Sequence, residues 1–364
     1  MSTNLNVTQL SAVFVSRADF DDLILLLWST IVFFMQGGFA MLEAGAVQNN
    51  LRVNILFKNM IDSSIVALLF WAVGYGLAFG EPSTPFSGLG QFFLIGTPSS
   101  RYAFVFFQYS FTTTTATILS GGAAGRLRIG CYMIYCVAMG SVMHPIVIHW
   151  IWANSGWLYA FGPNALLGVG LMDFAGGVAV HVNGGAATLV AIWLGGYRNQ
   201  QSNDPSNPPR YEPVGNGKWR NNVLPAASVS DSTYGVFILW FGFFAFNMGS
   251  FVTFAGRGDL VGLVGINSAL CSAGSALSTV FFSQVWQRVL LWRGRIAKVN
   301  SWQMDDVLNG TLVGLVAATS NCSLVEPWAA VVIGVAAGAQ KMRACWSLLT
   351  LVPYKALCTI WWCA

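Results

Sequence analysis

Three ionisable side chains stand in long apolar runs of this sequence, where they could act on a small cation or a proton. Glu43 ends the first run, and Asp173 and His181 lie in a later, glycine-rich one. Such side chains cost about 2.5 kcal/mol or more at bilayer depth, so they often line ion or proton pathways. A carboxylate attracts cations, and a histidine binds and releases protons near neutral pH. The sequence therefore indicates cation or proton chemistry inside an apolar environment.

Asp173 and His181 are eight residues apart, which on one helix predicts a broad common face and a separation of about 12 Å. Asp173 can cap a helix by accepting backbone N–H groups at its positive end. That role is compatible with a second one, a fixed negative charge beside a cation site. His181 is either a hydrogen-bonded core histidine or a pore-lining group, and the glycines around it favour the pore.

Two further histidines, His144 and His149, share an earlier run but do not form a metal pair. Their spacing of five turns them about 140° apart, unlike the i, i+4 pair that binds zinc on one helix face. The sequence also contains no GxSxG, P-loop or CxxC motif. We therefore expect no enzyme activity, no metal and no cofactor.

The composition requires a membrane around these residues. Hydrophobic residues make up 55% of the chain and charged residues 9%, whereas soluble domains carry roughly 25% charged residues. The 39 glycines and 15 tryptophans suit close helix packing and membrane interfaces, respectively. A dispersed net charge of +4 gives no reason to expect nucleic acid as a partner. The expected class is an all-α polytopic membrane protein in a lipid bilayer.

Runs of about 20 apolar residues predict nine membrane spans. They are Leu23–Leu42, Ile61–Phe79, Tyr102–Ala124, Gly130–Trp152, Leu166–Leu194, Tyr234–Phe254, Leu260–Val285, Val307–Ala318 and Trp328–Ala339. Cys345–Ala364 is a tenth, less regular candidate. With the N-terminus outside, 14 of the 18 lysines and arginines fall on the inner side, as the positive-inside rule requires. The sequon at Asn6 then faces outward, and the plasma membrane is the expected location.

The spans predict five segments. Residues 1–22 are an extracellular N-terminal segment, 23–195 a first five-helix half and 196–232 a cytoplasmic connector rich in Asn, Pro, Gly and Ser. Residues 233–339 form a second half of four helices, and 340–364 a divergent tail. Two halves of odd helix number have opposite orientations, as in inverted-repeat transporters.

Five stretches, in order, resemble the ammonium transporter family in its animal form. They are FMQGGFAMLEAG at 34–45, DFAGGVAVH at 173–181, WFGFFAFNMGS at 240–250, and Asn309-Gly310 followed by EPWAA at 326–330. The resemblance implies a bundle of eleven helices in inverted 5+5 repeats plus one, of which about nine or ten are present here. It also implies one pore per subunit of a trimer.

The resemblance assigns roles to six residues. Trp152 and Ser250 match an external site that recruits ammonium, with Asp173 supporting it. Phe111 and Phe246 match the stacked rings that close the pore, Phe111 also bordering the recruitment site. His181 matches the first of two pore histidines. Ammonium and potassium are similar in size, but only ammonium can donate hydrogen bonds and release a proton to a histidine.

The second pore histidine of the family has no counterpart here, because the three histidines lie at 144, 149 and 181. The family pattern is lost after about Gly338, and a reading-frame shift in the gene is one explanation for residues 340–364. Two functions follow from these observations. The first is ammonium transport through a homotrimer, and the second is a non-conducting, modulatory or sensing subunit of a mixed trimer.

Overall fold

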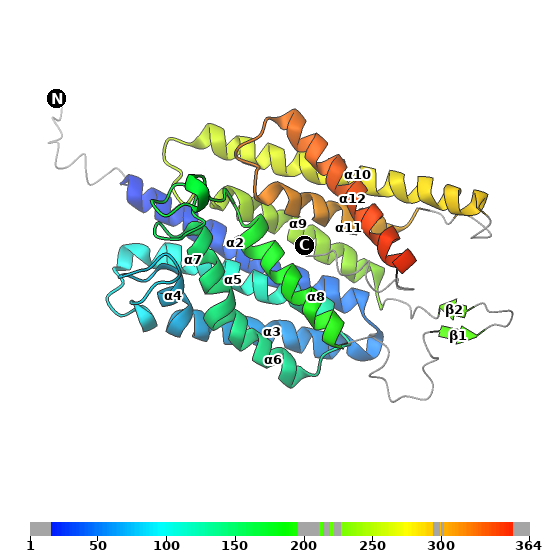
Figure 1. Ribbon diagram of the computed structural model, residues 1–364, viewed down its shortest axis with the longest axis horizontal. Helices are drawn as coiled ribbons and strands as arrows, with labels where there is room; N and C mark the ends of the chain where they lie inside the picture. Colours follow the sequence, from blue (N-terminus) through cyan, green and yellow to red (C-terminus); the bar gives the residue numbers. More distant parts are fainter. Residues whose placement is uncertain are drawn as a thin grey trace, which may run out of the picture.

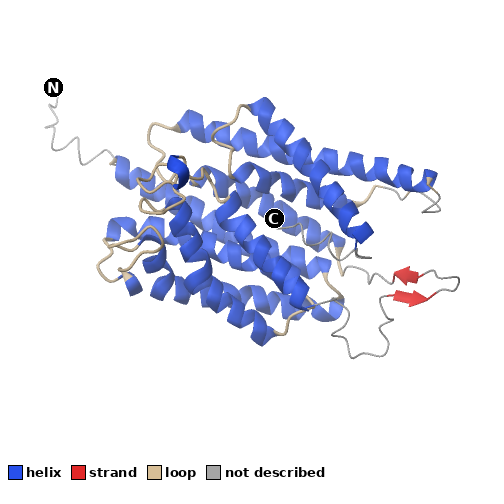
Figure 2. Ribbon diagram, viewed as in Figure 1, coloured by secondary structure: helices blue, strands red, loops and turns tan. Residues whose placement is uncertain are grey.

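The computed structural model describes residues 16–195, 211–213, 219–221, 227–293, 299 and 302–351. Within these ranges the chain is a bundle of long helices that run roughly side by side (Figures 1 and 2). Most of the expected connector and the end of the expected tail lie outside the described residues. The strands β1 (Tyr211–Pro213) and β2 (Trp219–Asn221) form one antiparallel pair at the end of the bundle where α2 ends.

The first half consists of helices that are interrupted by wider turns. It contains α2 (Arg17–Ala46), α3 (Arg52–Leu69), η2 (Phe70–Gly74), α4 (Tyr75–Phe79), α5 (Tyr102–Ala123), α6 (Ile129–Ala138), η5 (Met139–Met143), α7 (His144–Trp152), η7 (Gly177–Val182) and α8 (Asn183–Gly195). The segments η2, η5 and η7 are π-helical, and η2 and η5 each join two α-helices into one span. A Cβ on Gly74 would lie 2.6 Å from the oxygen of Gly140, so these two π turns touch through their backbones.

The second half contains α9 (Val229–Gly249), α10 (Gly258–Trp292), α11 (Met304–Thr319) and α12 (Pro327–Leu351). Helix α9 begins earlier than expected because Ser228 caps it, its hydroxyl accepting a hydrogen bond from the Asp231 amide at 3.1 Å. Helix α12 continues past residue 340, where the tail was expected to begin, and includes the first residues of the tenth candidate span. The division of the chain into five segments remains a prediction.

Six of the described helical segments are long and apolar enough to cross a membrane. They are Arg17–Ala46, Asn49–Phe79, Ile129–Trp152, Gly177–Gly195, Val229–Gly249 and Gly258–Trp292. Helix α5 is buried along almost its whole length and carries a run of threonines. The hydroxyls of Thr112, Thr113, Thr114 and Thr115 donate to carbonyls one turn earlier, so the helix satisfies its own polar groups. The chain is therefore an all-α multi-pass bundle.

The fifth expected span, Leu166–Leu194, is wrong in its first part. The chain from Leu166 to Gly176 is a loop with one short turn, η6 (Leu166–Gly168), and the long helix begins only at Gly177. Leu167 has φ 56° and is 91% exposed, and Gly176 has φ 94°. These left-handed positions end any helical repeat, although the residues around them are apolar.

The two halves meet where α2 packs against α9. A Cβ on Gly38 would lie 3.1 Å from the oxygen of Gly235, and one on Gly235 would lie 2.5 Å from the amide of Leu42. Glycine on both helices lets the backbones touch, as in tightly packed membrane helices. The close approach positions the next turns of α9, which carry Phe243 and Phe246.

Candidate functional site

Two phenylalanine rings from different halves form the centre of the candidate site. Phe111 of α5 and Phe246 of α9 stack with ring centroids 4.0 Å apart and planes inclined by 16°. Both side chains are almost fully buried. Trp152, at the end of α7, meets Phe111 edge-on at 5.8 Å. The three rings predicted to lie together therefore do so.

His181 also contacts Phe246. Its ring is 5.7 Å from Phe246 and stacks on Phe243 at 5.5 Å, with planes 19° apart. The side chain is 2% exposed, and neither ring nitrogen has a hydrogen-bond partner within the described part of the chain. Buried histidines normally hydrogen-bond at least one nitrogen. The interpretation as a hydrogen-bonded core histidine is therefore wrong.

Asp173 caps the π-helical turn that carries His181. Its Oδ2 accepts from the amides of Val178 and Ala179 at 2.9 and 2.8 Å, and its Oδ1 accepts from the Ser320 hydroxyl at 2.9 Å. Asp173 precedes the helix, so the expected eight-residue helical face shared with His181 is wrong. The capping interpretation is confirmed, and the carboxylate fixes both the start of this helix and the end of α11.

Trp152 is held in place by the same loop. Its Nε1–H donates to the backbone oxygen of Asp173 at 2.7 Å. A Cβ on Gly176 would lie 3.2 Å from the indole, which explains why this loop position must be small as well as left-handed. The indole edge is therefore oriented by backbone atoms, and its ring faces are left for packing or for a ligand.

Ser250 lies directly after α9, one helical turn beyond Phe246. Its hydroxyl donates to the Phe246 carbonyl at 2.8 Å. Because a serine oxygen has two lone pairs, this bond leaves the oxygen free to accept from a donor such as an N–H⁺ group. The i, i+4 spacing puts Ser250 on the same side of α9 as the stacked ring.

Of the other two histidines, His149 has hydrogen-bond partners, whereas both ring nitrogens of His144, like those of His181, have none among the described residues. The Nδ1 and Nε2 of His149 lie 2.7 Å from the carbonyl oxygens of Ala78 and Thr84, which ties the loop after α4 to α7. His144 is fully buried at the start of α7. His149 therefore has a packing role that its spacing from His144 did not reveal.

Sequence reasoning missed two residues of this site. Phe243 precedes Phe246 by three residues, so helical spacing could have placed both rings against His181. Ser320 is 147 residues from Asp173 in the sequence, and no local pattern signals their contact.

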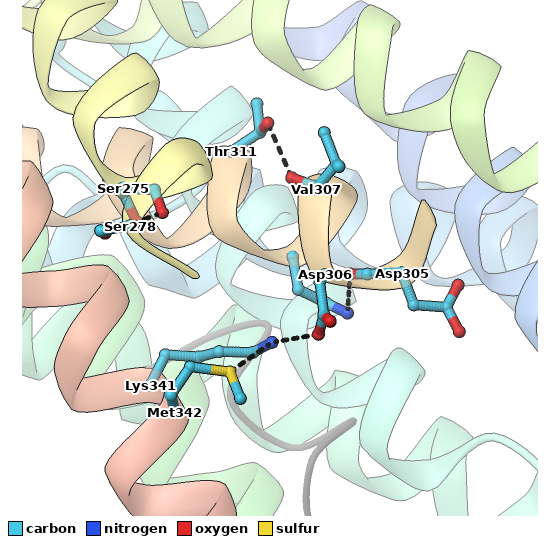
Figure 3. Close-up of polar contacts among 9 residues, drawn as sticks. Ser275, Ser278, Asp305, Asp306, Val307, Thr311, Lys341 and Met342 are labelled. Carbon is cyan, nitrogen blue, oxygen red and sulfur yellow. Dashed lines mark hydrogen bonds and ion pairs between the residues drawn. The ribbon is translucent and has the colours of Figure 1, made fainter. Parts of the chain in front are cut away.

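A second polar region lies between α10, α11 and α12, away from the rings. Figure 3 shows Asp306 of α11 facing Lys341 of α12, with Oδ1 and Nζ 3.6 Å apart. Thr311 and Ser278 nearby bond to carbonyls of their own helices. Lys341 is 4% exposed, so this ion pair lies at the bundle interior.

Packed apolar helices, with an aromatic and histidine path between the halves, define a multi-pass α-helical membrane protein. The family model described as "Ammonium Transporter Family" matches residues 23–355, and the chain belongs to that family of transporters. The matched range extends past residue 339.

Curated relatives agree with this assignment. The chain is 37% identical over 313 residues to putative ammonium transporter 1 of Caenorhabditis elegans, covering 85% of this chain and 54% of that protein. It is 34% identical over 331 residues to ammonium transporter 1 member 3 of Solanum lycopersicum, covering 88% and 66%. The chain thus spans about half to two thirds of the length of these relatives.

Solved structures share the fold. A protein titled Sensor Amt Protein superposes with a TM-score of 0.78 at 28% identity, covering 95% of this chain and 79% of that one. Saccharomyces cerevisiae Mep2 gives 0.73 at 23% identity, covering 94% and 70%. At the lower identity the likeness concerns the fold alone.

Proposed function

We propose that this chain transports ammonium across a membrane, as ammonia with or without its proton. The observation that carries the proposal is the row of rings from Trp152 through Phe111 and Phe246 to His181, whose nitrogens have no partner in the described residues. A buried imidazole without a partner is suited to hydrogen-bond a small polar solute, and an apolar path to it disfavours hydrated ions.

The first step is recruitment of the cation. Trp152 offers an indole face, where a cation gains about 0.5–2 kcal/mol. Ser250 offers oxygen lone pairs, since its own proton is committed to Phe246. Asp173 acts here through position and charge, because its carboxylate is bonded to Val178, Ala179 and Ser320.

The second step is passage of the rings and contact with the histidine. Phe111 and Phe246 are in van der Waals contact, so a solute must separate or tilt them and lose its water. Ammonium can leave a proton behind and cross as a neutral molecule that hydrogen-bonds His181. Potassium has no proton to lose, so the same path excludes it.

A trimer in the plasma membrane with its N-terminus outside fits this function. The family relationship and the distribution of lysine and arginine support that arrangement. In this arrangement the connector 196–232 and the region after residue 339 would lie on the cytoplasmic side of the membrane.

A modulatory or sensing subunit is the second candidate. It is supported by the likeness to the structure titled as a sensor and by the presence of only one histidine, His181, on the ring path of the described residues. The two candidates differ in whether the chain conducts.

Uptake in cells without their own ammonium transporters separates them. The chain is expressed with an external tag, surface protein is measured, and ammonium uptake is compared with potassium uptake. Saturable ammonium uptake that excludes potassium and is lost in His181→Ala supports transport. Surface protein without uptake overturns it and favours the modulatory candidate.

A further inference from the structure

Two of the three histidines are buried without a hydrogen-bond partner, and the proposed transport uses only one of them. The side chain of His144 is 0% exposed and that of His181 is 2% exposed. Within the described part of the chain, no group bonds to a ring nitrogen of either residue. Buried polar groups are normally hydrogen-bonded, so His144 needs an explanation, and a binding role is one.

The π turn η5 sets the direction in which His144 points. The His144 amide donates to the Met139 carbonyl, an i to i+5 bond that closes this turn. One π turn therefore separates the two residues, and their side chains lie on the same side of the span. Five residues of regular α-helix would instead leave them about 140° apart.

The residues one turn before and one turn after His144 show what this side of the span faces. Met139 is fully buried in an apolar cluster with residues of α5 and α8. Ile148, four residues after His144, is fully buried in a cluster with residues of α5 and η7. His144 thus lies between two clusters that face α5 and the span formed by η7 and α8.

The ring of His144 reaches the π turn that carries His181. The Ala179 carbonyl is close enough to interact with the His144 ring, although the two do not reach hydrogen-bond geometry. The same carbonyl accepts from the Asn183 side chain at 3.3 Å. Ala179 precedes His181 by two residues, so one histidine belongs to η7 and the other lies against it.

His144 and Trp152 share a broad side of α7. They are eight residues apart, which is about 80° around the helix and about 12 Å along it. Trp152 meets the Phe111 ring at one end of this side, and its indole lies beside Gly176, just before η7. Segment η7 therefore starts beside the end of α7 and runs back along it toward His144.

The elements that carry the row of rings also surround His144. Phe111 belongs to α5, Trp152 to α7 and His181 to η7, and these three elements pack against one another. The clusters on both sides of His144 include residues of α5, so its ring lies in the same contact region. A solute that has passed Phe111 can therefore meet His144 after His181.

His149 shows how a histidine with a packing role is bound on the same helix. Its two ring nitrogens each lie 2.7 Å from a backbone carbonyl oxygen. His144 is five residues earlier and equally buried, but it has no such bonds among the described residues. One histidine thus ties a loop to α7, while the nitrogens of the other remain able to bind a solute.

A small neutral molecule with both donors and a lone pair fits this imidazole. A neutral imidazole offers one N–H donor and one nitrogen lone pair. Ammonia can accept from the first or donate to the second, and water can do the same. Potassium could use only the lone pair, and the apolar clusters on both sides of His144 disfavour its charge.

We propose that His144 is a second binding site for ammonia, which the solute reaches after His181. Ammonia forms a hydrogen bond with an imidazole nitrogen there, and no covalent bond forms or breaks. The first half of this chain then supplies both histidines that the solute contacts. That ammonia reaches His144 during passage rests on the proposed function, whereas its binding there does not require net transport.

Nitrogen-15 NMR of the purified chain in lipid nanodiscs, with its three histidines labelled, tests the site. Ammonium chloride is compared with potassium chloride at equal concentration and pH, so that water and ionic strength are the same in both samples. We expect ammonium, and not potassium, to shift the ring-nitrogen resonances of His144 and His181. The resonances of His149 are the internal control and should stay in place.

The resonances are assigned by removing one histidine at a time, as His144→Gln, His149→Gln and His181→Gln. If His144→Gln fails to fold, the other two chains assign its resonances by elimination. His144 resonances that do not respond to ammonium, or that respond equally to potassium, overturn the proposal. An equal shift of all three histidines also overturns it, because such a shift reports a change of the whole bundle.

Uptake tests the role of His144 in transport separately. His144→Phe keeps a planar ring without a hydrogen-bonding nitrogen, whereas His144→Gln keeps a donor and an acceptor. Ammonium uptake per surface molecule should fall about tenfold in His144→Phe and by less in His144→Gln. Unchanged uptake in His144→Phe rejects the role, and an equal loss in both variants assigns the residue to packing. Ammonium-dependent His144 resonances in a chain without uptake keep the binding site and reject the proposed transport alone.

Discussion

The ring path around His181 and the polar cluster around Asp62 bury their ionisable groups in different ways. His181 is surrounded by Phe243 and Phe246, and its nitrogens have no partner among the described residues. Asp62 receives hydrogen bonds from Tyr132, Thr117 and Ser63. The His181 nitrogens can therefore still form hydrogen bonds with a solute. The hydrogen bonds of Asp62 instead join helices α3, α5 and α6.

This difference predicts which property each region controls. A partnerless group contributes little to stability, so its removal should mainly change transport. Removing a group with several buried partners leaves those partners without a hydrogen bond. Each such partner lowers the free energy of unfolding by about 1–3 kcal/mol. We therefore expect stability and transport to separate between the two regions.

The largest expected effect is on stability, in Asp62→Ala. The substitution strands the Tyr132 hydroxyl and removes one acceptor each from the Thr117 and Ser63 hydroxyls, and it should lower the free energy of unfolding by roughly 3–5 kcal/mol. Thermal unfolding in detergent, followed by tryptophan fluorescence and size-exclusion chromatography, measures it. Glu81→Ala, at an exposed acid, is the control. Equal stability of the two variants would mean that the Asp62 network does not join the helices.

The next effect is on transport, in His181→Ala. Loss of a group that binds or relays a proton typically costs about 100-fold or more, and we expect ammonium uptake per surface molecule to fall by that factor. Stability should change little. His149→Ala is the matched histidine control, because it removes a buried histidine that contacts the Ala78 and Thr84 carbonyls instead of the rings. Uptake retained in His181→Ala would contradict the expectation that the ring path controls transport.

A smaller effect is expected at the entrance, in Trp152→Phe. The smaller ring keeps the edge contact with Phe111 but loses the bond to the Asp173 carbonyl and part of the cation–π attraction. The concentration of ammonium at half-maximal uptake should rise about three- to tenfold. Trp150→Phe is the control, because the Trp150 Nε1–H donates to the Phe86 carbonyl in the loop after α4. A similar rise in both variants would assign Trp152 to packing.

A separate effect on stability is expected in the second half, at Asp306 and Lys341. Removing Lys341 alone, as in Lys341→Met, should cost about 1–3 kcal/mol because Asp306 is left largely buried and unpaired. The double variant with Asp306→Asn should recover stability to within about 1 kcal/mol of the original chain. A double-mutant cycle in the unfolding assay measures the coupling. Strictly additive costs would show that the two side chains act independently.

The helices could be predicted because apolar runs near the bilayer thickness have few alternatives in a membrane. The start of the fifth span could not, because Leu166 to Met172 is apolar enough for a helix. The chain instead adopts left-handed conformations at Leu167 and Gly176, which hydropathy does not detect.

Phe246 and His181 of the ring path lie within two of the family motifs, whereas Phe111 and Trp152 lie outside the quoted stretches and were assigned position by position from the resemblance. Glu43 was recognised as an unusual buried acid, but its network was not. Its partners Asn59 and Ser120 are 16 and 77 residues away and belong to helices whose orientation the sequence alone does not fix. The hydrogen-bond partners of a buried polar side chain depend on how the helices pack, and the sequence of a single apolar run does not reveal them.

The π turns η2 and η5 change how the spans containing them should be read. A π turn accommodates one residue more than an α turn, so the residues after it are rotated by about 100° from the phase of those before it. A substitution scan along 52–79 or 129–152 should therefore show sensitive positions that repeat regularly up to the turn, miss one step, and then resume. In each of these two spans, the helical positions that contact neighbouring helices before the π turn therefore differ from the positions that contact them after it.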